Sequence, residues 1–340
     1  MAFDFPNAPT VGQVYTSPTG VAYTWDGQKW ASGSGYGAIY VSDTPPSAPS
    51  GSLWWESDSG ILYISYNDGN SIQWVAIGGV RGNVIAVGQC RLVVSGANLA
   101  LMPFGGNVIT INGVGCTIPA AGVTIAPTGL TVSGLYYIYA VATAGVVTSL
   151  EALATGHATS STPGNIGVEI KSGDDTRTLV GMARVITGPA WADTPAQRFV
   201  RSWFNDPGIY SFSQFATTRQ TSAAAYVEVN AEIRIEALIW SGETWDVTQY
   251  IASFSNTATN SNSFSTIGFN SAVPEKNGIL VTIVGAIAGT AFGAGCSSAK
   301  AGLTEGYNFA TLIGKCDAGT AAWTSSADGN RTIMKGYARR

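Results

Sequence analysis

Residues 164–185 read GNIGVEIKSGDDTRTLVGMARV, and the rest of the chain is arranged around this stretch. Two short runs rich in β-branched and apolar residues, 166–171 and 178–185, flank the turn cluster SGDD at 172–175. Such runs, joined by Gly and Asp, are typical of two antiparallel strands and their turn. We therefore expect a β-hairpin at the centre of the chain.

The stretch that follows, TPAQRFVRSWFND at 194–206, leaves two structures open. Asp193 stands before Thr-Pro, which is a signal for the start of a helix. The residues after it fit an extended aromatic strand equally well. Arg198 and Arg201 flank aromatic residues, so cation–π packing at a subunit contact is expected there. We expect residues 189–208 to form a neck between a middle and a distal domain.

Composition limits the class of protein. Only 11% of the 340 residues are charged, whereas globular domains average about 25%, and 42 residues are glycine. A surface built from Ser, Thr, Asn and Gly suits tightly assembled β structure. The net charge of −4 argues against nucleic acid as a partner. The first residues, MAFDFPNAPTVG, have neither the basic nor the apolar segment of a secretory signal.

Residues that could carry chemistry are sparse. The cysteines Cys90, Cys116, Cys296 and Cys316 stand alone, and His157 is the single histidine. We expect no metal site and no cofactor, and we expect reduced, buried thiols, although Cys90–Cys116 and Cys296–Cys316 bridges are conceivable. His157 lies in a turn-rich segment without a nucleophile motif, so a loop histidine is expected rather than part of a hydrolase. We predict that the chain is not an enzyme.

One segment imitates a membrane span. The residues between Lys276 and Lys300 carry no charge and contain overlapping GxxxG spacing. Their many glycines weaken a helix, and β-branched residues cluster at 279–284. We predict a buried strand at 279–284, a Gly/Ala-rich loop after it, and no membrane insertion.

The front of the chain reads as two small Trp-rich β units, 1–34 and 51–79, joined by a Pro/Ser-rich linker at 35–50. Each unit has a strand, a glycine turn, a Tyr-bearing strand, an Asp-Gly turn and a closing Trp. Four tryptophans are expected to serve as core and docking residues: Trp25, Trp30, Trp55 and Trp74. A carbohydrate-binding aromatic platform is the alternative use of these rings.

Behind the front, short β-rich runs recur between glycines throughout residues 80–188 and 209–340. This spacing predicts an all-β chain with a middle β-sandwich and a distal, jelly-roll-like antiparallel β-sandwich. The run AYVEVNAEIRIEALIW, at 225–240, alternates for several residues between an apolar face, from Val227 to Ile235, and a charged face, from Glu228 to Glu236, as a strand does. Glu232 and Glu236 would then lie together on its exposed face, where a solvated surface is expected rather than a catalytic pair.

Several of these segments together resemble a known family. KSGDDTRTLVGMARV and RFVRSWFND resemble a module of tailed-bacteriophage fibres and other virion appendages, and AEIRIEALIW, GYNFATLIGK and GYAR resemble the distal domains attached to it. The front repeats are similar to N-terminal modules of tail-fibre and head-fibre proteins. The similarity is strongest over residues 135–206.

The resemblance implies a virion protein, a homotrimeric fibre or spike that binds other virion proteins through its N-terminus. The distal domain would face a host-surface glycan or protein, through the polar loops at 256–263 and 325–330 and three candidate rings: Trp245, Tyr307 and Trp323. For each of these rings, a place in the core is the favoured alternative. A capsid or head–tail decoration protein is the second hypothesis. A glycan-degrading enzyme is the third, and the sequence lacks the β-helix repeat and clustered acids expected of one.

Overall fold

In the computed structural model, the residues described are 4–18, 21–32, 39–77, 88–275, 281–285, 287–326 and 329–339. The chain divides into two compact units, Met1–Val84 and Ile85–Arg340. Every regular element in the described residues is a β-strand, except the 3-10 turn η1 (Ala231–Ile233), which confirms the all-β prediction. Within those same residues, no helix has the length and hydropathy needed to cross a membrane.

The first aromatic module, residues 4–32, is an antiparallel meander of β1 (Val14–Thr16), β2 (Ala22–Trp25) and β3 (Trp30–Ser32). The predicted Asp-Gly turn joins β2 to β3. The Oδ1 atom of Asp26 accepts hydrogen bonds from the backbone N–H groups of Gln28 and Lys29, each at 2.8 Å. Gly27 supplies the positive φ, +103°, that this turn requires. The turn thus forms for the reason that the sequence indicates.

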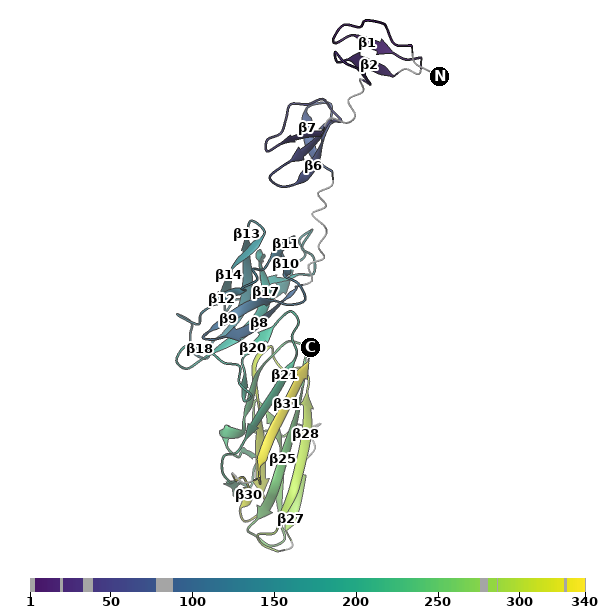
Figure 1. The fold of residues 1–340 in the computed structure, drawn as a ribbon. Coiled ribbons are helices and arrows are strands. Elements are labelled where there is room, and N and C mark those ends of the chain that lie inside the picture. The colour runs from purple at the N-terminus through teal and green to yellow at the C-terminus, as the bar shows by residue number, and fades with distance from the viewer. Residues whose placement is uncertain are drawn as a thin grey trace. The chain divides into compact units, whose positions relative to one another are not determined.

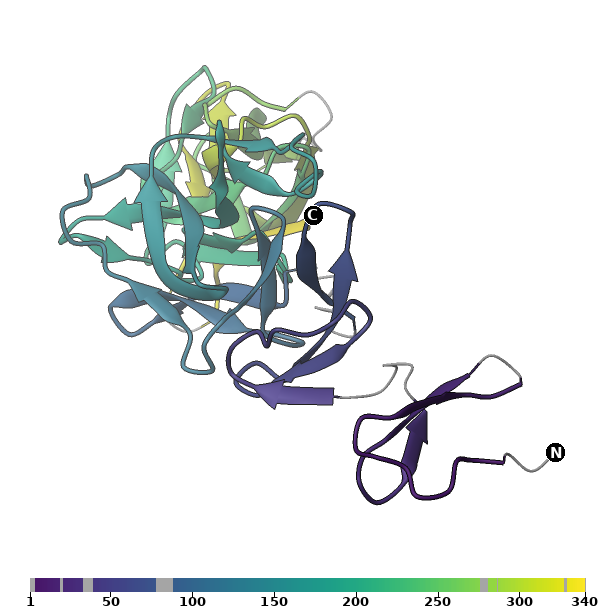
Figure 2. The same cartoon turned by 90° about the horizontal axis from the view of Figure 1, so that it is seen from above.

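The second aromatic module, residues 39–77, is a four-stranded sheet (Figures 1 and 2). Its strands are β4 (Ile39–Ser42), β5 (Leu53–Glu56), β6 (Ile61–Asn67) and β7 (Ile72–Ala76). Asp68 repeats the turn of the first module, with Oδ1 accepting from the N–H groups of Asn70 at 2.9 Å and Ser71 at 2.8 Å. The segment predicted to be a linker contributes β4, which pairs in parallel with β5.

The ring at the centre of this sheet is one that the sequence analysis did not select. Trp54 is only 4% exposed, whereas its neighbour Trp55 is 43% exposed. The Trp54 ring stacks on Tyr63 with 4.8 Å between centroids and meets Trp74 edge-on at 5.5 Å. Its indole N–H donates to the carbonyl of Ser42 at 2.9 Å. Trp54 is therefore the core residue of the second module.

The middle sandwich packs a large sheet against a small one. The large sheet contains β10 (Val108–Ile111), β11 (Val114–Thr117), β13 (Leu135–Thr143), β14 (Val146–Leu153), β15 (His157–Thr159), β16 (Glu169–Lys171), β17 (Asp174–Ile186), β18 (Ala190–Trp191) and β20 (Val200–Ser202). The small sheet contains β8 (Cys90–Ser95), β9 (Asn98–Pro103) and β12 (Val123–Ile125). Their core includes Leu99, Ile109, Ile138 and Val180, all fully buried.

The predicted central hairpin is confirmed as β16 and β17, with a turn tighter than expected. Asp174 and Asp175 already belong to β17, so only Ser172 and Gly173 form the turn. Residues 166–168 lie outside the strand. β17 is the organising strand, because β13, β16, β18 and β20 all pair with it.

The distal sandwich consists of two six-stranded sheets. One contains β19 (Gln197–Arg198), β23 (Val227–Glu228), β24 (Ile235–Ile239), β26 (Ser261–Phe269), β27 (Val281–Gly285) and β29 (Gly306–Cys316). The other contains β21 (Ile209–Gln214), β22 (Arg219–Thr221), β25 (Thr244–Asn256), β28 (Ala291–Lys300), β30 (Ala321–Trp323) and β31 (Thr332–Arg339). The buried rings Trp245, Phe254 and Trp323 fill the space between them.

Two strand predictions in this sandwich are wrong in detail. Residues 225–240 are not one strand, because η1 interrupts them: Asn230 caps the turn by accepting from the N–H of Glu232 at 2.9 Å. The Gly/Ala-rich stretch expected to be a loop is a turn at 287–290 and then forms β28, whose backbone pairs with β25 along most of its length. Of the strand predicted at 279–284, residues 281–284 lie in β27, and residues 279–280 lie outside the described residues.

The neck is extended, which settles the choice that the sequence left open. β19 pairs in parallel with β24 of the distal sandwich, and β20 pairs with β17 of the middle one. Gly181 allows β20 to lie this close, because a Cβ atom at that position would stand 2.3 Å from the carbonyl oxygen of Arg201. Asp193 bridges to Arg198 instead of capping a helix. The neck residues are thus shared between two sheets.

All four cysteines are free and buried, as the sequence predicts, so neither conceivable bridge forms. Burial raises the pKa of the Cys90 and Cys296 thiols to about 12. These thiols remain protonated near neutral pH and act as small apolar side chains.

The two adjacent tryptophans of β5 provide a matched test of the second module. Trp54→Ala should cost about 3–5 kcal/mol, which a sheet of this size cannot sustain, whereas Trp55→Ala should leave the fold intact. Limited proteolysis of the full chain should then cut within residues 39–77 of the first variant only. Equal resistance of both variants would contradict the central role of Trp54.

Candidate functional site

One sheet face of the second aromatic module is dominated by apolar side chains, with Tyr66 and Gln73 in the row at its end. Cross-strand register places Ile39, Leu53, Ile64 and Val75 in one row, and Val41, Trp55 and Leu62 in the next. Residues directly opposite each other in neighbouring strands share a face. These seven residues are named the apolar face: Ile39, Val41, Leu53, Trp55, Leu62, Ile64 and Val75.

This face is open to solvent although it carries no charge. Val41 is 66% exposed, Ile39 56%, Val75 44% and Trp55 43%. The opposite face of the sheet holds the Trp54 ring cluster and is therefore already used as the core of the module. Contiguous exposed apolar surfaces are typical of sites that bind another protein, a membrane or a ligand. The apolar face is the first candidate site.

The four tryptophans selected from the sequence divide between these two roles. Trp25 and Trp30 are half-buried and lie against each other at 5.6 Å in the ring cluster of the first module. Trp74 is half-buried beside Trp54 in the second module. Trp55 alone lies on the apolar face. Three of the four are thus packing residues, and the fourth is a surface residue.

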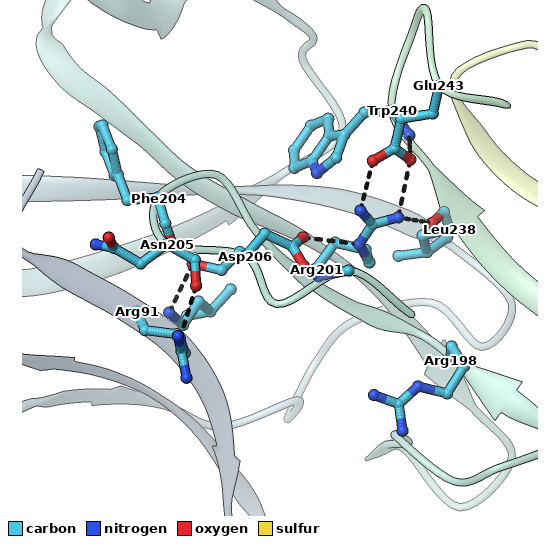
Figure 3. Close-up of polar contacts among 12 residues, drawn as sticks. Arg91, Arg198, Arg201, Phe204, Asn205, Asp206, Leu238, Trp240 and Glu243 are labelled. Atoms are coloured by element: carbon cyan, nitrogen blue, oxygen red, sulfur yellow. Dashed lines mark hydrogen bonds and ion pairs between the residues drawn. The ribbon is translucent and has the colours of Figure 1, made fainter. Parts of the chain in front are cut away.

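The second candidate site is the junction between the middle and distal sandwiches, which has a buried arginine at its centre. Arg201 of β20 is 1% exposed and forms a paired contact with Glu243, Nη2 to Oε1 at 2.6 Å and Nη1 to Oε2 at 3.0 Å. Its Nε donates to Asp206 at 2.8 Å, and Nη1 also donates to the carbonyl of Leu238 at 2.8 Å. Figure 3 shows the guanidinium held between the two carboxylates.

Arg201 belongs to the middle sandwich through β20, whereas Glu243 and Leu238 belong to the distal sandwich, so these contacts join the two. Burial opposes the charge of Arg201, but hydrogen bonds and charge from Glu243 and Asp206 outweigh burial and raise its pKa. Removing one member of such a group would leave an uncompensated buried charge, which costs far more than an exposed pair does. We refer to Arg201, Glu243 and Asp206 as the arginine triad.

Apolar residues of both sandwiches surround the arginine triad. Tyr139, Leu179 and Met182 of the middle sandwich form one buried cluster with Leu238 and Trp240 of the distal sandwich. The ring of Trp203 meets that of Trp240 edge-on, with 4.9 Å between centroids. This cluster makes the junction a continuous core rather than a hinge.

A cleft of about 390 Å³ opens beside the triad, lined by residues of β8, the neck and the start of β21. Its arginines already have protein partners. Nε of Arg91 donates to the carbonyl of Asn205 at 2.8 Å, and Nε of Arg198 lies 3.1 Å from Asp193. Arg198 stands apart from the triad (Figure 3). The cleft is therefore lined by structural contacts of the junction.

His157 occupies the junction as well, which corrects its assignment as an ordinary loop residue. Its Nδ1 lies 2.6 Å from Glu169, and its Nε2 lies 3.1 Å from Glu305 of the distal sandwich. Glu305 also accepts from the hydroxyl of Tyr137 at 2.8 Å and from the N–H of Ser241 at 3.1 Å. With carboxylates at both nitrogens, the imidazole is engaged as a bridge between the sandwiches.

The protonation states at this bridge reinforce one another. The hydrogen bond to Glu305 is the largest influence on His157 and raises its pKa above 6.5, although burial works against this. Burial alone would raise the pKa of Glu305, but hydrogen bonds from His157, Tyr137 and Ser241 outweigh it and lower the pKa below 4.5. A protonated His157 facing an ionised Glu305 is the favoured pair.

The structure places the three distal rings in the interior or at the junction. Trp245 and Trp323 are fully buried in the distal core, so they present no ring to a ligand. Tyr307 is half-buried, and its hydroxyl donates to Glu236. These three residues are therefore packing residues, which was the alternative that the sequence left open.

The polar loops expected to contact sugars use their hydrogen bonds internally. In the first loop, Asn256 donates to Ser263 at 2.7 Å and Ser261 donates to the carbonyl of Ala318 at 2.8 Å. In the second, the hydroxyl of Ser325 donates to the carbonyl of Phe215 at 2.7 Å, while residues 327–328 lie outside the described residues. These polar groups hold the distal sandwich together.

The expected pair of exposed carboxylates is not a pair. Glu232 lies in η1 and forms an ion pair with Arg219, whereas Glu236 lies in β24 and accepts from Gln197 at 2.7 Å. The described residues contain no group of three His, Cys, Asp or Glu side chains placed to hold a metal ion.

Arg201 was singled out in the sequence, but for a cation–π contact at a subunit surface, and the structure makes it a buried ion-pair partner instead. Its partner Glu243 carried no sequence signal, because the pair spans 42 residues. The apolar face did have a signal, namely apolar residues at every second position of β4, β5 and β6.

Comparisons with known proteins give only weak similarity. No protein-family model matches the sequence, and no curated protein matches it. Among solved structures, the chain is similar to one titled "Structure of infectious bursal disease virus Gt strain", with 13% identity over 62% of this chain and a TM-score of 0.23. The present chain covers 58% of the length of that viral chain.

Two further structures of the same virus give similar values. The Gx strain structure has 12% identity, a TM-score of 0.20, and covers 84% of this chain and 71% of that one. The VP2 subviral particle has 13% identity, a TM-score of 0.17, and covers 82% and 72%. Similarity at this level does not establish a shared fold or function.

The arginine triad can be tested by comparing a buried with an exposed arginine. Arg201→Ala should lower the free energy of unfolding by about 3–5 kcal/mol, because Glu243 would remain buried without its partner. Arg219→Ala removes an ion pair whose side chains are 32% and 28% exposed, and it should cost at most about 1 kcal/mol. Denaturant unfolding followed by tryptophan fluorescence measures both. Equal losses would rule out the triad as the main polar contact of the junction.

The His157 bridge predicts a pH dependence. Because the folded state raises the pKa of His157 above 6.5, its contribution to stability is complete below pH 6.5 and is lost as pH rises through the raised value. Glu305 contributes above pH 4.5 and loses its contribution as pH falls through its lowered value. The melting temperature should therefore fall as pH rises beyond 6.5, and His157→Gln should flatten that fall. Parallel curves for the two proteins would exclude the bridge as the cause.

Proposed function

We propose that this chain is a structural protein of a bacteriophage virion, a homotrimeric fibre or spike that attaches to the particle through its N-terminal unit. The observation that carries the proposal is the apolar face of the second aromatic module. An uncharged sheet face with Val41 66% exposed is unfavourable in water and favours burial against another protein. The attachment partner is accordingly a virion protein with a matching apolar surface.

The second unit supports the same function by its construction. Its two sandwiches share the neck strands, the arginine triad and one apolar cluster, so they act as one body. A projection on a virion needs such a body, since it must keep its form while only one end is attached. The division at Val84 separates this body from the unit that bears the apolar face.

The resemblance of the central and distal segments to phage appendage modules agrees with this assignment. A decoration protein that stabilises the capsid or the head–tail connection is the alternative, and it would use the same apolar face. Electron micrographs of virions labelled with an antibody against the second unit separate the two. A fibre places the label at a distance from the particle surface, whereas a decoration protein places it on the shell.

Attachment can be tested with substitutions on the apolar face in the full chain. Val41→Asp and Val75→Asp should each reduce incorporation into particles by roughly tenfold or more, because a charge would be buried at the contact. Val114→Asp is the matched control, since Val114 is 48% exposed on β11 of the other unit. Incorporation is measured by immunoblotting of purified particles.

A deletion of Met1–Val84 should leave a soluble second unit that no longer joins particles. Normal incorporation of this deletion, or of both apolar-face variants, would refute attachment through the N-terminal unit.

A further inference from the structure

The distal sandwich carries a second uncovered surface, on the outer face of the sheet formed by β21, β31, β25 and β28. These strands lie side by side in Figure 1. Their register gives three outward rows across the sheet: Tyr210–Tyr337–Asp246–Ala299, Phe212–Lys335–Thr248–Ser297 and Gln214–Ile333–Tyr250–Gly295. The five large apolar members are named the tyrosine face: Tyr210, Phe212, Tyr250, Ile333 and Tyr337.

Three tyrosine rings of this face are exposed, and two of them lie against each other. Tyr250 is 55% exposed, Tyr337 49% and Tyr210 45%. The rings of Tyr210 and Tyr337 have 5.1 Å between centroids. Exposed tyrosines on adjacent strands supply large, rigid contact area, and such residues are enriched where proteins associate.

The aromatic rings on the outer face of the opposite sheet are covered, unlike those of the tyrosine face. There, cations of the same chain cover the rings: Arg184 over Tyr307 at 4.1 Å, Arg234 over Phe309 at 4.2 Å and Lys315 over Phe264 at 4.2 Å. The middle sandwich covers the end of that face near Tyr307. Among the described residues, no cation lies over a ring of the tyrosine face.

The charges on the tyrosine face indicate what covers it. Only Asp246 and Lys335 are charged among the twelve residues of the three rows. Neither forms an ion pair or a side-chain hydrogen bond with another described residue, whereas the arginines and lysines named on the opposite face lie over rings of their own chain. Within these three rows the free acid and the free base complement a second copy of the surface, and Arg339, opposite Thr244 in the next row, borders them.

We propose that the tyrosine face is the surface through which copies of this chain associate, with Asp246 of one copy opposite Lys335 of another. The inference rests on the homo-oligomeric part of the proposed function and adds the residues that form the contact. Aromatic side chains provide the buried area, and the two charges fix the orientation, because a contact with like charges opposed would be repelled.

Light scattering on the purified full chain tests the proposal at micromolar concentration. The wild-type chain should have the mass of an oligomer. Tyr210→Glu and Tyr250→Glu should each shift the population toward monomer, with the dissociation constant raised roughly tenfold to a hundredfold. Val273→Glu is the control, because Val273 is 68% exposed in the same sandwich and lies outside the tyrosine face. Circular dichroism and thermal melting verify that every variant is folded.

A charge exchange gives the sharper readout. Asp246→Lys and Lys335→Asp should each weaken association by opposing like charges, and the combined D246K/K335D variant should restore the mass of the wild type. Restoration requires that the two residues meet across copies. Failure of the combined variant, with both single variants impaired, would overturn the opposed pair.

The outcomes separate this inference from the proposed function. A folded oligomer unaffected by the tyrosine substitutions would exclude this face as the contact. The attachment proposal would be unaffected, because particle incorporation tests it separately. A monomeric wild-type chain would overturn both the inference and the homotrimer. Loss of cell binding with unchanged mass would assign the face to a host surface instead of to a second copy.

Discussion

The second unit depends on one arginine that has no access to water. Arg201 leaves β20 between the two sandwiches and meets Glu243, Asp206 and the carbonyl of Leu238. Because an unpaired charge there would be very unfavourable, β17, β20 and β24 must be in place together for the group to be satisfied. The apolar cluster adds to this junction, and the ring of His157 packs against its tryptophans Trp203 and Trp240. Folding of the middle sandwich and docking of the distal sandwich are consequently coupled.

Local signals in the sequence were sufficient for the hairpin and for the Asp-Gly turns, because a turn is determined by the few residues that form it. The all-β class likewise followed from short β-branched runs between glycines. The neck could not be predicted, because its conformation depends on pairing with β17 and β24, which are distant in sequence. For the same reason the sequence could not show which of Trp54 and Trp55 is buried. The two residues face opposite sides of the sheet, and which side becomes the core depends on how β4 and β5 pair.

The chain has few charged residues, and many of them form ion pairs with one another. Arg177 contacts Glu151, Arg234 contacts Glu228 and Arg219 contacts Glu232. Charges are thus concentrated in contacts within the chain, and hydroxyl and amide groups satisfy much of the distal interior. The apolar face and the tyrosine face differ from the rest of the surface, because no ion pair of the described residues covers them. One lies on each unit, so the proposed attachment and the proposed self-association would use separate parts of the chain.

The shared neck also limits how related chains could exchange parts by recombination. β19 belongs to the distal sheet and β20 to the middle sheet, although a single residue, Phe199, separates them. A genetic crossover placed after the middle sandwich would bring in a distal sandwich whose receiving strand had evolved with a different neck. Such a joint is tolerated only if the neck, β24 and the loop bearing Glu243 are inherited together.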